Sequence, residues 1–259
     1  MRLKIFSYNI RGLPFFPDSW SNPLADWFNN TDYDCVCLQE VFTEGRIKML
    51  TDSLKKNGYT VIKPNDFAKR YNLMSSGLLT AVKTERWSIL EEGFHFYEHS
   101  TVIENITNKG FHWLKVTEKN KQNKQNKPIL LINTHMQADH SINLFSGCID
   151  TRPIRKKQAE QILKLIEHVK TNHLIIGDIN CEIEPHNDFL YLTGRKTGIQ
   201  KHTFICTGED LDHVAYIPKI MPKRPIVKEV SVLSKLWWSD HWPIFVIVEL
   251  PLSIDFSGL

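Results

Sequence analysis

Residues 174–180, Leu-Ile-Ile-Gly-Asp-Ile-Asn, place a short buried strand directly before polar residues. The aliphatic run predicts the strand, and Gly177 allows a tight backbone turn at its end. Asp178 and Asn180 stand two positions apart, so an extended backbone would aim both side chains in one direction. A carboxylate and an amide directed together from a buried strand favour a functional site. The alternative is an ordinary Asx turn, for which Gly-Asp is typical.

The composition is that of an ordinary globular protein. The chain has 259 residues, 42% of them hydrophobic and 24% charged, which is enough for a sizeable core in one large domain or two. Because no linker-like stretch and no repeat is found, we expect one domain over residues 1–259. The net charge of +3 permits an anionic substrate but does not demand nucleic acid.

No stretch of the sequence is typical of secretion or membrane insertion. Arg2, Lys4 and Arg11 interrupt any apolar run at the N-terminus, and no run of about 18 apolar residues exists. Cys35 and Cys37 share one face of a predicted strand, so we expect buried thiols, not a bridge. We therefore expect an intracellular, cytoplasmic protein without a transmembrane segment; the oligomeric state is left open.

Hydrophobic periodicity predicts many strands and few helices. Strands are expected at residues 3–9, 35–38, 59–62, 78–82, 111–116, 129–133, 174–176, 212–217, 226–233 and 243–250. Helices are expected at residues 22–29, 44–57 and 153–170. Residues 119–127 are polar and cationic, and we expect a flexible hairpin tip there. This pattern predicts a layered α/β sandwich built on mixed sheets.

Polar residues stand at the ends of several predicted strands, or directly before one. They are Asn9, Gln39-Glu40, Asn133-Thr134-His135, Asp178 with Asn180, and Ser239-Asp240-His241. Each alone has an ordinary explanation as a turn former, a helix-start charge, a core histidine or a helix cap. Five such endings in one chain favour convergence on one edge of a sandwich, and therefore a shared site.

In this order, the five motifs resemble those of the endonuclease/exonuclease/phosphatase superfamily. That superfamily includes pancreatic deoxyribonuclease, abasic-site endonucleases, inositol polyphosphate 5-phosphatases and neutral sphingomyelinases. The resemblance covers nearly the whole chain. It implies a four-layer α/β sandwich with two packed mixed β-sheets, as in deoxyribonuclease.

A narrower resemblance points to the neutral sphingomyelinases. Residues 108–111, Asn-Lys-Gly-Phe, are similar to a segment of those enzymes, as are residues 134–139 and 40–42. An ordinary turn into a strand would also explain residues 108–110. Bacterial sphingomyelinases carry an exposed aromatic hairpin before the Ser-Asp-His motif, where this chain is short. Trp237 and Trp238 remain there, either as an interfacial anchor or as core residues.

The resemblance implies a metal-dependent phosphodiesterase acting on sphingomyelin-like lipids at a membrane surface and releasing phosphocholine. Glu40 supplies a hard carboxylate oxygen suited to Mg²⁺, with Mn²⁺ as an alternative. Asn9, beside it, and Asp240, near the metal, are the other expected metal residues. His241 is the expected base, because imidazole titrates near neutrality, and Asp212 would orient it. The other expected catalytic residues are Asp178, which would orient the water or protonate the leaving group, and Asn180 and His135, which would hold phosphoryl oxygens.

Two other functions fit the same motifs. A nuclease or DNA-repair phosphodiesterase would need basic residues flanking the site to contact phosphates. Three basic groups are available for this: Lys69-Arg70; Arg152, Arg155, Lys156 and Lys157; and Lys219, Lys223 and Arg224. A catalytically inactive binding module is the other alternative, and the intact set of polar motifs argues against it.

Overall fold

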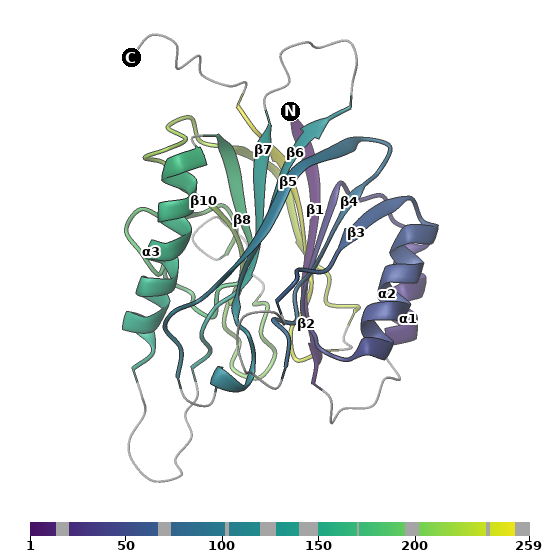
Figure 1. The fold of residues 1–259 in the computed structure, drawn as a ribbon, viewed down its shortest axis with the longest axis horizontal. Coiled ribbons are helices and arrows are strands. Elements are labelled where there is room, and N and C mark those ends of the chain that lie inside the picture. Colours follow the sequence, from purple (N-terminus) through teal and green to yellow (C-terminus); the bar gives the residue numbers. More distant parts are fainter. Residues whose placement is uncertain are drawn as a thin grey trace.

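The computed structural model describes residues 1–13, 21–66, 74–101, 104–119, 128–139, 150–169, 171–194, 202–236 and 239–251. Within these residues, two six-stranded sheets pack face to face. Helices α1 (Ser21–Phe28) and α2 (Glu44–Lys56) cover one outer face, and α3 (Arg152–Val169) covers the other (Figure 1). The predicted α/β sandwich of packed mixed sheets is confirmed.

The first sheet has the strand order β11-β12-β1-β2-β4-β3. Strand β1 pairs in parallel with β2 and antiparallel with β12, so the sheet is mixed. Its strands are β11 (Ile226–Val232), β12 (Ile244–Glu249), β1 (Arg2–Gly12), β2 (Cys35–Val41), β4 (Leu79–Lys83) and β3 (Tyr59–Ile62).

The second sheet has the strand order β5-β6-β7-β8-β10-β9. Strands β7 and β8 are parallel, whereas β10 runs antiparallel to β8. The strands are β5 (Trp87–Phe96), β6 (Gly110–Glu118), β7 (Ile129–His135), β8 (Asn172–Asp178), β10 (Asp212–Tyr216) and β9 (Leu190–Tyr191). A short 3₁₀ helix, η2 (Glu104–Ile106), lies between β5 and β6.

The core is layered because successive side chains of a strand face opposite sides. Leu174 and Ile176 of β8 point into the cluster between the sheets, whereas Ile175 joins the cluster under α3. A third cluster lies between the first sheet and helices α1 and α2. Cys35 and Cys37 are buried and unbridged, with their Sγ atoms 3.6 Å apart, as predicted.

Strand register brings the polar endings to one edge of the sandwich. Asn9 lies opposite Gln39 across β1 and β2, and Asp178 lies opposite both His135 of β7 and Asp212 of β10. A Cβ atom on Gly177 would approach the Thr134 carbonyl oxygen to 2.1 Å, so glycine allows β7 and β8 to meet closely at this edge.

Strand β5 was not predicted from the sequence. It is an edge strand with three consecutive exposed residues, 90–92, and a bulge between Ile89 and Glu91, so apolar and polar residues do not alternate regularly. The predicted hairpin tip lies almost entirely outside the described residues. Among the described helices, none has the length and apolar character needed to cross a bilayer.

Candidate functional site

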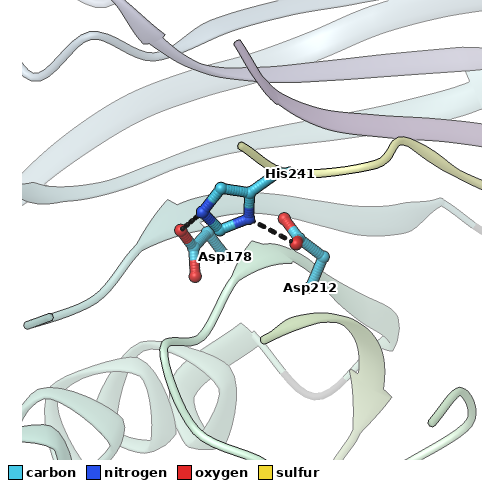
Figure 2. Close-up of side chains that lie close together, drawn as sticks. All are labelled: Asp178, Asp212 and His241. Carbon is cyan, nitrogen blue, oxygen red and sulfur yellow. Dashed lines mark hydrogen bonds and ion pairs between the residues drawn. The ribbon is translucent and has the colours of Figure 1, made fainter. Parts of the chain in front are cut away.

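A histidine lies between two carboxylates at the edge where the polar strand endings meet. His241 Nδ1 donates a 2.7 Å hydrogen bond to Asp212 Oδ2, and its Nε2 lies 3.7 Å from Asp178 Oδ2 (Figure 2). All three side chains are buried. Asp212 begins β10, Asp178 ends β8, and His241 comes from the segment before β12, so both sheets contribute to this arrangement.

Burial and charge shift the protonation of this group. Burial raises the pKa of Asp178 to about 7, even though His241 stabilises its negative charge. Burial opposes a charge on His241, but the Asp212 and Asp178 carboxylates outweigh it and raise the His241 pKa to about 10.

Asn9 connects two of the predicted acidic residues. Its Nδ2 atom donates to Asp178 Oδ2 at 2.8 Å and to Glu40 Oε1 at 3.0 Å. Its amide oxygen accepts a hydrogen bond from the Arg11 backbone, which fixes the orientation of the amide. Asn9 therefore presents nitrogen to Glu40 and joins the ends of β1, β2 and β8 across the two sheets.

Lys109 is a cation of the site that was not predicted as a site residue. Its Nζ atom donates to His135 Nε2 at 3.1 Å and to the Met136 carbonyl at 2.8 Å, and it forms an ion pair with Glu104. The same His135 nitrogen lies 3.6 Å from Asp178 Oδ2. The signal in the sequence was the Asn-Lys-Gly-Phe stretch, which could also be an ordinary turn.

Asn180 reaches the site by a route that differs from the prediction. Its backbone φ is +58°, and its N–H donates to Asp178 Oδ1 at 2.9 Å, so residues 178–180 form an Asx-type turn. The expectation of an extended backbone was wrong here, because the left-handed residue ends the strand geometry. The Asn180 side chain instead donates to the Met136 carbonyl, which also accepts from Lys109.

Asp240 lies at the outer side of the same group. Its Oδ2 atom is 3.3 Å from Arg11 Nε, and its charge contributes to raising the pKa of Glu40, for which burial is the main cause. Asp240 and Glu40 keep 18% and 17% of their side-chain surface exposed, so both carboxylates remain accessible. The eight predicted site residues thus gather at one edge of the sandwich.

The acidic residues fit a hard divalent cation. Glu40 is a largely buried carboxylate whose pKa is raised by burial, and it lies in the field of Asp240. A cation beside such a carboxylate would stabilise its charged form, and carboxylate oxygens are the ligands that Mg²⁺ prefers.

Asp178, Asp212 and His241 also have ligand atoms within 4.8 Å of one another and could hold a metal ion. We interpret the 2.7 Å contact between Asp212 Oδ2 and His241 Nδ1 as a hydrogen bond, which would leave only Nε2 of this histidine for a metal.

Two of the predicted basic residues in the part of the chain that the structure describes are held by carboxylates. Arg155 is buried and donates to Gln137 O and Asp139, and the exposed Arg152 pairs with Asp150. Residues 219–224 come after the last residue of β10, whereas Asp212 is the first residue of that strand. They therefore lie away from the site. Residues 69–70 and the two tryptophans at residues 237–238, expected as either an anchor or core residues, lie outside the described residues.

No protein-family model matches the sequence. A sphingomyelinase C of Bacillus cereus is 26% identical, and the alignment covers 96% of this chain and 89% of that protein. Another sphingomyelinase C of Bacillus cereus is 25% identical over 75% of this chain. In that comparison the chain spans 62% of the relative's length.

Several solved structures share the fold. An endonuclease/exonuclease/phosphatase family protein from Bacteroides thetaiotaomicron has a TM-score of 0.68 and 17% identity, covering 96% of this chain and 97% of that chain. A mutant beta toxin from Staphylococcus aureus with bound magnesium ions has a TM-score of 0.68 and 17% identity, covering 95% and 99%. D. rerio TDP2 with a single-strand DNA product has a TM-score of 0.69 and 14% identity, covering 96% and 99%.

The structural neighbours agree with the two-sheet architecture. The chain is therefore similar in sequence to sphingomyelinase C over most of its length, and it shares its fold with a protein of the endonuclease/exonuclease/phosphatase family.

Proposed function

We propose that the chain is a Mg²⁺-dependent phosphodiesterase that hydrolyses a choline phospholipid of the sphingomyelin type, releasing phosphocholine. The observation that carries the choice of substrate is Lys109. It belongs to the Asn-Lys-Gly-Phe stretch that resembles sphingomyelinases, and its ammonium group lies 3.1 Å from His135 Nε2 inside the site. The 26% identity to a sphingomyelinase C over 96% of the chain supports the same substrate class.

Glu40 and Asp240 are the residues that would hold the cation, with Asn9 fixing the Glu40 carboxylate. The magnesium ions bound to the similar beta toxin support Mg²⁺, with Mn²⁺ as an alternative. When bound, the cation would neutralise charge on the phosphate oxygens, and a positive charge at the site would favour the neutral imidazole that can act as a base.

The chain's own residues then carry the proton transfers. His241, held by Asp212, accepts a proton from the water that attacks phosphorus. Asp178, whose burial raises its pKa to about 7, orients this water or protonates the departing alkoxide oxygen. Asn180, His135 and Lys109 stabilise the negative charge that develops on the phosphoryl oxygens.

A nuclease is the second candidate, because the similar TDP2 structure holds a single-strand DNA product. The positions of the described basic residues favour it less. Arg155 is buried in structural hydrogen bonds, and residues 219–224 lie at the end of the sandwich away from the site. Binding to a nucleic-acid backbone needs several accessible cations along the strand.

A substrate panel distinguishes the two functions. Sphingomyelin vesicles, a soluble phosphocholine diester and nicked duplex DNA would be tested with and without Mg²⁺ at 50 and 200 mM salt. We expect release of phosphocholine from the first two substrates with Mg²⁺. A nuclease would instead cleave DNA, and its binding would weaken by about 10³–10⁵ across that salt range. DNA cleavage without any phosphocholine release would reject the sphingomyelinase proposal.

A matched pair of lysine variants tests Lys109, the residue on which the proposed choice of substrate rests. Lys109→Met should lower phosphocholine release strongly, because it removes the buried cation beside His135. Lys115→Met is the control, since Lys115 lies in the adjoining strand β6 and pairs with Glu91 at the surface. Equal activity of both variants would show that Lys109 does not contribute to substrate turnover.

A further inference from the structure

The loop of residues 203–209, here called the clamp loop, closes on itself beside the site. The backbone N–H groups of Thr203 and Phe204 both donate to the Glu209 carbonyl, at 3.0 and 2.9 Å. The Gly208 N–H returns to the Phe204 carbonyl at 3.1 Å. The loop is therefore a compact unit that can hold its neighbours in place.

One face of the clamp loop holds the start of β10. The Thr203 hydroxyl oxygen accepts hydrogen bonds from two consecutive backbone amides, those of Leu211 at 2.9 Å and Asp212 at 3.0 Å. Thr203 is buried, so these amides have no easy access to water. The hydroxyl thus fixes the backbone from which the Asp212 side chain projects.

The same loop holds the segment that carries His241. The Thr203 carbonyl accepts from the Trp242 amide at 2.7 Å, and the Ile205 amide donates to the Asp240 carbonyl at 2.8 Å. Between them, the Phe204 ring lies 4.9 Å from the His241 ring, centroid to centroid. One residue, Thr203, therefore bonds to both segments whose side chains form the Asp212–His241 hydrogen bond.

The Asp212 carboxylate depends on its backbone for orientation. Its Oδ2 atom accepts from His241, whereas its buried Oδ1 atom has no hydrogen-bond partner among the described residues. With one side-chain bond, the carboxylate can rotate or shift if residues 211–212 move. A displacement of about 1 Å in a catalytic group can lower turnover by about 10²-fold.

We propose that Thr203 is a positioning residue, whose hydroxyl and carbonyl set the relative placement of Asp212 and His241. The hydroxyl holds the aspartate from the β10 side, and the carbonyl holds the histidine segment. The catalytic readout of this inference rests on the proposed function, but the geometry that it concerns can be measured without substrate.

Three variants separate the hydroxyl from the bulk of the side chain. Thr203→Val removes the acceptor and keeps the shape, whereas Thr203→Ser keeps the acceptor. Thr193→Val is the matched control, because the Thr193 hydroxyl accepts from the Val214 amide, at 3.0 Å, on the same strand β10. Both threonines are buried, so both valine variants should lower Tm by similar amounts.

Phosphocholine release from sphingomyelin vesicles gives the first readout. We expect Thr203→Val to lower kcat by about 10- to 100-fold with KM unchanged, and Thr203→Ser to restore it. Thr193→Val should keep wild-type kcat despite its lower Tm. Equal kcat in the two valine variants, or a failure of serine to restore it, would overturn the proposal. Thr203→Ala serves as the same test if the valine variant does not fold.

The second readout is the NMR signal of the His241 Nδ1 proton, assigned by its loss in His241→Gln. The hydrogen bond to Asp212 should give a strongly downfield resonance in the wild type and in Thr193→Val. It should shift or broaden in Thr203→Val and return in Thr203→Ser. An unchanged resonance in Thr203→Val would reject the positioning role. Because no substrate is used, this result stands even if the wild type hydrolyses none of the tested phosphodiesters.

Discussion

At the start of β8, His173 is buried beside two backbone groups that satisfy both of its nitrogens. Nδ1 donates to the Thr171 carbonyl, and Nε2 accepts from the Ile217 amide, each at 2.9 Å. Burial lowers the His173 pKa to about 4, so the imidazole stays neutral at physiological pH. Nothing about this histidine depends on a ligand.

At the other end of the same strand, Asp178 is equally buried but has side chains as partners. They come from Asn9, His135 and His241, in addition to the Asn180 backbone amide. Burial raises its pKa to about 7, within reach of a neutral solution. Burial alone therefore does not mark a functional residue. What distinguishes Asp178 is that its protonation depends on other titratable groups, among them His241 and Asp212.

Removal of divalent cations should have the largest effect and should act on one end of the sandwich alone. An excess of chelator should abolish phosphodiester hydrolysis, and added Mg²⁺ or Mn²⁺ should restore it. Mg²⁺ at 100 times its Kd should also raise stability by about 2.7 kcal/mol. Calorimetry would measure this as a higher Tm, and Glu40→Gln should lose the increase. Full turnover in excess chelator would show that the carboxylates at the Asp178 end of β8 do not need a divalent cation for activity.

Substitutions at the two ends of β8 should affect different properties, which are activity at the Asp178 end and stability at the His173 end. Glu40→Gln, Asp178→Asn and His241→Ala should each lower kcat by about 10²–10⁴-fold while the protein stays folded. Their combined effect should fall well short of additive, because the groups act as a unit. His173→Gln should reduce Tm and leave kcat unchanged. A His241→Ala protein with near-normal turnover would remove His241 from the role of base.

Asp212→Asn should have a smaller effect than loss of His241 itself. The amide can still contact Nδ1 but no longer carries the charge that stabilises the imidazolium, so we expect about a 10- to 100-fold loss in kcat. Steady-state kinetics on a soluble phosphocholine diester would measure it. A loss as large as that of His241→Ala would mean that Asp212 takes part in the chemistry directly.

Acid should weaken the His173 end by a modest amount. An unfolded histidine gains its proton near pH 6.5, whereas folded His173 gains it only near pH 4, so the free energy of unfolding falls between these values. That gap corresponds to about 3 kcal/mol at most. Denaturant unfolding of His173→Gln should therefore show a shallower fall from pH 6.5 to 4 than the wild type. Parallel curves for the two proteins would show that His173 does not contribute.

The pKa of His241 is shifted in the opposite direction from that of His173, so its effect on stability appears at alkaline pH. Its folded pKa of about 10 lies above the unfolded value, so it contributes stability below pH 6.5 that is lost as the pH rises through 10. His173 and His241 thus weaken the protein at opposite ends of the pH scale. His241→Gln should flatten the alkaline limb alone.

The sequence was sufficient for the layered fold because the buried strands are short, apolar and bounded by polar endings. Residues 174–176 illustrate this, since their side chains alternate between two apolar clusters. Strand β5 could not be found in the same way. An edge strand with exposed residues is defined by its pairing with β6, which is a contact between distant residues.

The site was predictable where residues sit at strand ends and unpredictable where a loop folds back. Asp178 and His135 follow from strand order and register. Lys109 depends on the bridge between Met74 and Thr107, which places residues 104–109 beside the site. Asn180 depends on a left-handed backbone that no periodicity reveals.

The hydrogen bond between the Gln39 amide and the Asn133 side chain, 2.9 Å long, links the two sheets immediately beneath the site. The Asn133 amide also donates to the Leu38 and Leu79 carbonyls of the first sheet. Any partial opening that separates the sheets at this edge must break these buried bonds, and it also parts Glu40 from His135. An expanded intermediate that keeps its helices would consequently be inactive. During denaturation, loss of activity should coincide with hydrogen exchange with solvent of the amide protons that lie between the sheets. Both should precede loss of the helical circular dichroism signal.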